Sequence, residues 1–113
     1  MSDSCIFCRI VAGSIPATIV ASNERALAFK DLHPQAPVHL LVIPRRHVAS
    51  LAAADDAADL GALMTLAADV AREAGVAESG YRVVTNIGND GGQTVGHLHL
   101  HVLGGRAFTW PPG

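Results

Sequence analysis

His97-Leu98-His99-Leu100-His101-Val102-Leu103 is a stretch in which histidine occupies every second position and aliphatic residues fill the gaps. In a β-strand, alternate side chains point to the same face. The pattern therefore predicts a strand over 98–103 that places its aliphatic side chains on one face and three imidazoles on the other, each about 6.5–7 Å from the next. Three titratable rings on one face are costly to bury without hydrogen-bond partners. Such a row suits either phosphate chemistry or metal binding.

The rest of the chain predicts an α+β domain with an antiparallel sheet of about five strands. The other strands are expected over 18–21, 26–30, 38–43 and 81–86, where short β-prone or apolar runs are bounded by turn residues. A short helix is expected over 5–11 and a long one over 57–74, where apolar residues recur at helical spacing. Asp55 or Asp56 can cap the long helix, and Gly75 can end it. One long helix covers one sheet face only, so we expect a homodimer to extend the sheet and complete its cover.

Composition limits the class of protein. The 113 residues are expected to form a single domain, 1–113, whose core is aliphatic because aromatic residues make up only 4%. A net charge of −2 argues against broad nucleic-acid or anionic-membrane binding. No apolar run approaches the roughly 20 residues of a membrane span, and the first residues do not resemble a signal peptide. We therefore expect a cytoplasmic location. In that reducing compartment, Cys5 and Cys8 are not expected to form a structural disulfide.

The triad segment and several other motifs resemble the histidine triad (HIT) family of nucleotide hydrolases and transferases, in particular its Hint branch. The similarity runs from about Cys5 to the last residue. It rests on Cys5-Ile6-Phe7-Cys8, Asp31-Leu32-His33-Pro34-Gln35-Ala36-Pro37, His39-Leu40-Leu41-Val42-Ile43-Pro44, Gly91-Gly92-Gln93-Thr94, the triad itself, Gly104-Gly105-Arg106 and Trp110-Pro111-Pro112-Gly113. The resemblance implies a HIT-like fold and a dimer in which the C-terminal tail, 107–113, reaches toward the partner's active site.

The resemblance also assigns catalytic roles. His99 matches the nucleophile, which would attack the α-phosphorus of a purine nucleoside 5′-phosphoramidate and form a nucleotidyl-histidine that water later hydrolyses. The backbone carbonyl of His97 would hold the Nδ1–H of that ring and fix its tautomer. His101 would donate a hydrogen bond to the phosphate or the departing amine. His39 matches a family histidine behind the triad that could shuttle protons or orient a ring.

A nucleotide pocket is expected from the same comparison. Asp31 matches a carboxylate that accepts hydrogen bonds from ribose hydroxyls, Leu32 an apolar residue against the base, and Asn86 a polar residue of the same pocket. The loop before the triad can bring backbone N–H groups to an anion at its glycines, and it offers side-chain donors. Its expected phosphate contacts are Gly92, Gln93 and Thr94, although the Hint branch often has Ser in place of Thr94.

Cys5 and Cys8 present two thiols that could share one metal ion with two further ligands. In bacterial Hint-like relatives the equivalents of His47 and His97 complete such a set, so the resemblance implies a structural Cys2His2 zinc site. No organic cofactor is expected. A redox pair and two free buried thiols remain alternatives. If the ring of His97 binds zinc, only its backbone carbonyl can serve His99.

Three other functions remain open from the sequence. The chain could be a nucleotide-binding interaction module with incidental catalysis, or a dinucleoside polyphosphate hydrolase. It could also be a metal-binding or redox protein that uses its cysteines and the histidine row. The turn Gly104-Gly105-Arg106 and the Trp-Pro-Pro-Gly end favour the phosphoramidase branch over the other hydrolases.

Overall fold

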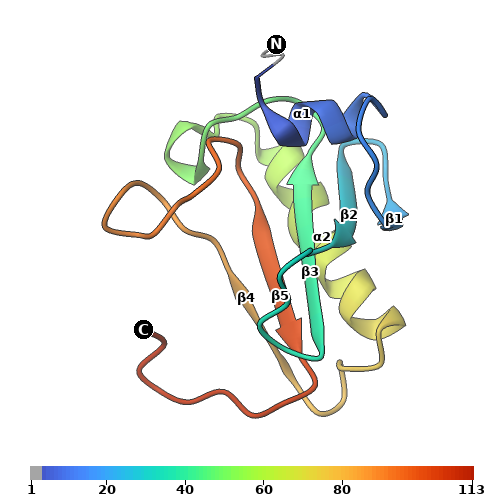
Figure 1. The fold of residues 1–113 in the computed structure, drawn as a ribbon, viewed down its shortest axis with the longest axis vertical. Coiled ribbons are helices and arrows are strands. Elements are labelled where there is room, and N and C mark those ends of the chain that lie inside the picture. Colours follow the sequence, from blue (N-terminus) through green and yellow to red (C-terminus); the bar gives the residue numbers. More distant parts are fainter. Residues whose placement is uncertain (1–3) are drawn as a thin grey trace.

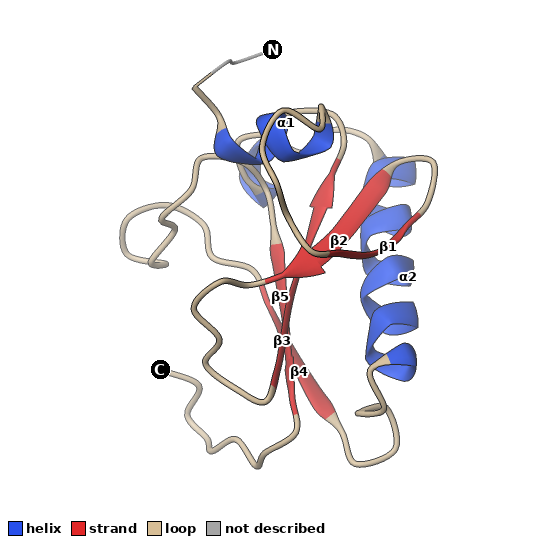
Figure 2. Ribbon diagram, turned by 45° about the vertical axis from the view of Figure 1, so that its right-hand side comes forward, coloured by secondary structure: helices blue, strands red, loops and turns tan. Residues whose placement is uncertain are grey.

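A five-stranded antiparallel sheet lies between a long helix on one face and a short helix on the other (Figure 1, Figure 2). The computed structural model describes residues 4–113. The strand order is β1-β2-β3-β5-β4, and every neighbouring pair runs antiparallel. The α+β architecture predicted from the sequence is confirmed. In chain order the elements are α1 (Ile6–Val11), β1 (Ile19–Ser22), β2 (Ala26–Lys30), β3 (Val38–Pro44), the 3-10 helix η1 (Leu51–Ala53), α2 (Ala57–Glu73), β4 (Tyr81–Val84) and β5 (Leu100–Gly104).

The long helix has the ends that its sequence predicts. Asp56 is the N-cap, and its carboxylate accepts hydrogen bonds from the backbone N–H groups of Ala58 and Asp59. Gly75 follows the C-terminal end with φ of +80°, a left-handed conformation that glycine adopts without steric cost. The capping residues therefore set the length of α2.

Both strands next to the glycine-rich loop are shorter than predicted. β4 ends at Val84, and β5 begins at Leu100 rather than two residues earlier. The backbone before β5 has other partners, since the Leu98 N–H donates to the Val48 carbonyl and the His99 carbonyl accepts from the Thr85 hydroxyl. These contacts take the place of ladder hydrogen bonds before β5.

The two faces of the triad segment differ as the alternation predicts. Leu98, Leu100 and Val102 are buried in the main core beneath α2, where Leu63 and Val70 are their helical counterparts. The histidines lie on the opposite face. A side-chain period of two thus separates the aliphatic core from the polar site within one segment.

The short helix α1 covers much of the second sheet face. Its Phe7 and Ile10 pack with Leu27 and Phe29 of β2 and with residues of β3. Over β2 and β3 this face is therefore covered by α1 of the same chain, and not by the dimerisation that we expected to cover it. The homodimer itself stays a prediction, and the two edge strands of the sheet are β1 and β4. Within residues 4–113, no helix combines the length and apolar character needed to cross a membrane.

Candidate active site and metal centre

A cavity of about 420 Å³ opens on the histidine face of the sheet. His99 and His101 line it together with Asp31 and Thr94. Its walls are otherwise largely apolar and include Ile6, Phe7, Ile10, Phe29, Leu32 and Val95. An apolar cavity with a few convergent polar groups is the ordinary form of a small-molecule site.

The ring of His99 is held in a single tautomer. Its Nδ1 lies 2.7 Å from the carbonyl oxygen of His97, and the side chain is buried. A carbonyl oxygen only accepts hydrogen bonds, so Nδ1 carries the proton and the lone pair of the neutral ring is on Nε2. The ring of Phe7 meets His99 edge-on, with centroids 5.2 Å apart, and restricts its rotation. His99 therefore has the tautomer that a nucleophile requires.

His101 is held in the opposite tautomer through His39. The backbone N–H of Gln35 donates to Nδ1 of His39 at 3.0 Å, so the proton of the neutral His39 ring is on Nε2. That Nε2 lies 2.9 Å from Nδ1 of His101. With His39 as the donor, His101 accepts at Nδ1 and carries its own proton on Nε2. The pair thus presents an N–H donor at a cavity where His99 presents a lone pair.

Burial, together with the smaller effects of the neighbouring His99 and His39, lowers the pKa of His101 to about 4, while Asp31 acts in the opposite direction. The ring is therefore neutral near pH 7, as the tautomer assignment requires. Asp31 lies close to this pair, with Oδ2 3.4 Å from Nε2 of His39. Its other oxygen accepts from the backbone N–H of His33 at 2.8 Å, which fixes the carboxylate at the cavity edge.

The predicted nucleotide contacts fall into two groups. Asp31, Leu32 and Thr94 line the cavity, and 86% of the Leu32 surface is exposed, so that side chain is free to meet a ligand. Asn86 and Gly92 lie outside that lining. Both stay predictions as ligand contacts.

Gln93 holds the glycine-rich loop together. Its side-chain NH2 donates to the carbonyls of Ala49 and Val95, and its Oε1 accepts from the backbone N–H of Gly88. The amide is thereby engaged within the protein. A direct phosphate contact from Gln93 stays a prediction, and its loop-organising role is what the contacts show.

Cys5, Cys8, His47 and His97 come together as the resemblance implied, with ligand atoms within 4.8 Å of one another. The sulfur–nitrogen distances are 3.3 Å from Cys5 to His97, 3.6 Å from Cys8 to His97 and 3.2 Å from Cys8 to His47. Ligands at zinc bond lengths and tetrahedral angles would be separated by about 3.5 Å. Nε2 of His97 lies 2.9 Å from the Pro44 carbonyl, which assigns the ring proton to Nε2 and leaves Nδ1 facing the sulfurs. These residues fit a metal ion.

A second group with metal-like spacing consists of Asp31, His39 and His101. Here the hydrogen bonds argue against a metal. Nδ1 of His39 accepts from Gln35, so a neutral ring must keep its proton on Nε2, the only other atom that could bind an ion. The three side chains instead form a hydrogen-bonded group.

Phe7 belongs to the Cys5-Ile6-Phe7-Cys8 motif, whose sequence does not indicate a role for it. The structure places it, with Ile6 and Ile10, on the cavity wall. The signal available was the apolar stripe of the short N-terminal helix, whose target face the sequence does not reveal. Gln35 was also missed, because its contribution to His39 comes from the backbone and leaves no trace in the residue type.

The fold and this arrangement of histidines define a class of proteins in which paired imidazoles on an antiparallel sheet face a small-molecule cavity. The HIT domain model matches residues 12–108, and the chain belongs to this family. An uncharacterised HIT-like protein from Synechocystis is 50% identical over 115 aligned positions that cover all of both chains. A HIT family hydrolase from Legionella pneumophila superposes with a TM-score of 0.94 at 47% identity, covering 97% of this chain and 100% of that one. A histidine triad protein from Clostridium difficile gives 0.92 at 41%, covering 96% of each.

Proposed function

We propose that the protein is a nucleotide-binding hydrolase that cleaves the P–N bond of purine nucleoside 5′-phosphoramidates. One observation carries the proposal. His99 and His101 face one cavity in opposite tautomers, which places an unprotonated nitrogen beside an N–H donor. Displacement at phosphorus is favoured by such a pair, because one group attacks while the other donates a hydrogen bond to the leaving group.

The reaction takes two steps on His99. In the first, Nε2 of His99 forms a bond to the α-phosphorus while the P–N bond breaks. The Nε2–H of neutral His101 donates a hydrogen bond to the departing nitrogen, which takes a proton from water and leaves as the amine. The Nε2–H of His39 donates to Nδ1 of His101 and keeps that donor in place. In the second step a water molecule attacks the phosphorus, the P–His99 bond breaks, and the hydroxide left from the first step accepts the proton of the attacking water. The products are the nucleoside monophosphate and a free amine.

The cavity walls accommodate the nucleoside. The Asp31 carboxylate accepts from the ribose hydroxyls, and the apolar surface that includes Phe7 and Leu32 receives the base. The glycine-rich loop, with Gly92 and the hydroxyl of Thr94, contacts the phosphate end. A homodimer joined along the β4 edge completes the assembly, with the tail of each chain directed to the leaving-group side of its partner.

Cys5, Cys8, His47 and His97 would hold a structural zinc ion. A zinc ion there would tie the start of α1, at Cys5 and Cys8, to the triad segment at His97. It would supply folding energy and not catalysis, because a closed site of four protein ligands has no position for substrate. The carbonyl of His97 remains on His99 and is independent of what the ring binds.

Turnover of a panel of substrates tests the proposal. Adenosine and guanosine 5′-phosphoramidates and a dinucleoside tetraphosphate are offered to the wild-type protein, to His99→Ala and to the surface control Asp69→Asn. We expect amine release by wild type and Asp69→Asn, loss of at least a thousandfold in His99→Ala, and a nucleotidyl group on His99 in quenched reactions. Preferred cleavage of the tetraphosphate would reassign the substrate, and nucleotide binding without turnover would indicate an interaction module.

A further inference from the structure

The turn after the triad strand is seated directly on the loop between β2 and β3. Gly105 has φ of +89°, and a Cβ placed there would lie 2.8 Å from Cβ of Pro37. A Cβ on Gly104 would lie 2.8 Å from Val76. Both glycines are thus required by close approach, and Gly105 also by its backbone conformation. The contact brings the next residue, Arg106, to the loop that leads into His39.

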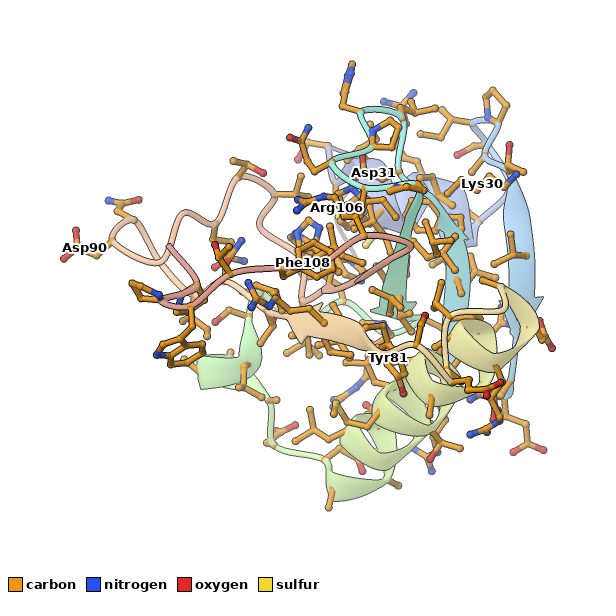
Figure 3. The ribbon with its side chains drawn as sticks, turned by 90° about the horizontal axis from the view of Figure 1, so that it is seen from below. Lys30, Asp31, Tyr81, Asp90, Arg106 and Phe108 are labelled. Carbon is orange, nitrogen blue, oxygen red and sulfur yellow. The ribbon has the colours of Figure 1, made fainter. Side chains whose placement is uncertain are left out.

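Arg106 holds that loop with two hydrogen bonds. Its Nε and Nη2 donate to the backbone carbonyl of Gln35 at 3.2 and 3.1 Å. The guanidinium also lies over the ring of Phe108, 4.2 Å from its centroid (Figure 3). Stacking on an aromatic face and paired donation from a rigid plane are properties of arginine that lysine lacks.

The residue that Arg106 anchors is the one that assigns the tautomer of His39. The Gln35 carbonyl accepts from Arg106, and the Gln35 N–H donates to Nδ1 of His39. Without that N–H, the neutral His39 ring is free to carry its proton on Nδ1. His39 then has no proton to donate to His101, and His101 is free to present its lone pair, instead of its N–H, to the cavity.

We propose that Arg106 is a positioning residue that fixes the tautomers of His39 and His101 from outside the cavity, through Gln35. The kinetic consequences rest on the proposed function, whereas the tautomers can be measured without any substrate. This proposal gives the Gly104-Gly105-Arg106 motif a structural role. Its glycines allow the close approach to Val76 and Pro37, and its arginine forms the hydrogen bonds to the Gln35 carbonyl.

The test compares Arg106→Ala with Arg82→Ala. Arg82 contacts the same Phe108 ring at 5.1 Å and donates to the Thr109 carbonyl, so it supports the tail without touching Gln35. Histidine ¹⁵N NMR on the substrate-free protein reports which ring nitrogen of His39 and His101 carries the proton. We expect mixed tautomers in Arg106→Ala and wild-type spectra in Arg82→Ala.

Kinetics provide the second measurement. We expect kcat for the phosphoramidate to fall about tenfold in Arg106→Ala, the lower end of what loss of a group that orients a functional histidine costs, with KM within about twofold. Arg106→Lys keeps the charge but loses the paired hydrogen-bond geometry, so its kcat is expected between those of the wild type and Arg106→Ala. If Arg106→Ala does not fold, Arg106→Lys provides the test of the proposal. Wild-type tautomers in the folded Arg106 variants, or equal losses in Arg82→Ala, overturn the proposal. If neither the wild type nor any variant hydrolyses phosphoramidates, the proposed function is wrong. The NMR comparison still tests the role of Arg106 in that case.

Discussion

Replacing Phe7 by alanine should destabilise the protein and disturb the site together. The Phe7 side chain is 6% exposed, and its ring meets those of Phe29, His97 and His99 at centroid distances of 5.6, 5.8 and 5.2 Å. Truncation of a buried phenylalanine costs about 3–5 kcal/mol. Set against a total stability of about 5–15 kcal/mol for a domain, that is a large share. At about 4 °C per kcal/mol for a chain of this size, the Tm should fall by about 12–20 °C.

Urea denaturation followed by circular dichroism measures this loss, and Met64→Ala is the matched control. Met64 is a large apolar residue on α2 with 54% of its surface exposed, so its truncation should change stability by no more than about 0.5 kcal/mol. Similar midpoints for the two variants would refute the packing of α1 against the second sheet face. So would unchanged His99 resonances in Phe7→Ala, because the lost ring contact should alter the surroundings of that imidazole.

Three further predictions concern charge and metal. The His101 ring should titrate in NMR with a midpoint near pH 4, because burial disfavours its charged form. The unfolded chain binds that proton first, near its ordinary pKa of about 6.5, so the stability of the fold should decline as pH falls from about 6.5 to 4; urea midpoints that stay level over this range would contradict the assignment. Asp59 is 9% exposed and accepts from Arg25 and Arg46, so Asp59→Ala should cost about 1–3 kcal/mol in denaturant unfolding. Metal analysis should find one zinc per chain in the wild type and much less in Cys8→Ser, and a chelator should lower the Tm of the wild type alone.

The regular elements could be predicted because their signals are local. The alternation over the triad segment and the helical spacing in α2 each report which face of an element is buried. The capping of α2 by Asp56 could also be predicted, because an N-cap depends on only a few neighbouring residues. The ends of β4 and β5 could not be predicted. Side chains and loop residues such as Thr85 form hydrogen bonds with backbone groups that would otherwise pair with the neighbouring strand.

The site was predictable only where residue type carries the chemistry. Histidine and cysteine are residue types that by themselves indicate metal-binding or catalytic chemistry. The family resemblance also placed His47 beside Cys8, although the two are too far apart in the sequence for any spacing rule to pair them. The link from Arg106 to Gln35 spans 71 positions and uses a backbone carbonyl, so neither residue type nor periodicity reveals it. The role of α1 as a cavity wall likewise depends on tertiary packing, which a six-residue helix does not specify by itself.

The period of two in the triad segment also limits which lengths of chain are tolerated there. Inserting a single residue between His99 and Leu100 would move the preceding imidazoles to the face that packs in the aliphatic core. The same insertion would move the Leu98 side chain to the face that carries the cavity. Deleting one would do the same. Length variation should therefore be confined to exposed turns away from the site, such as residues 77–80 before β4, while this segment can change only by substitution.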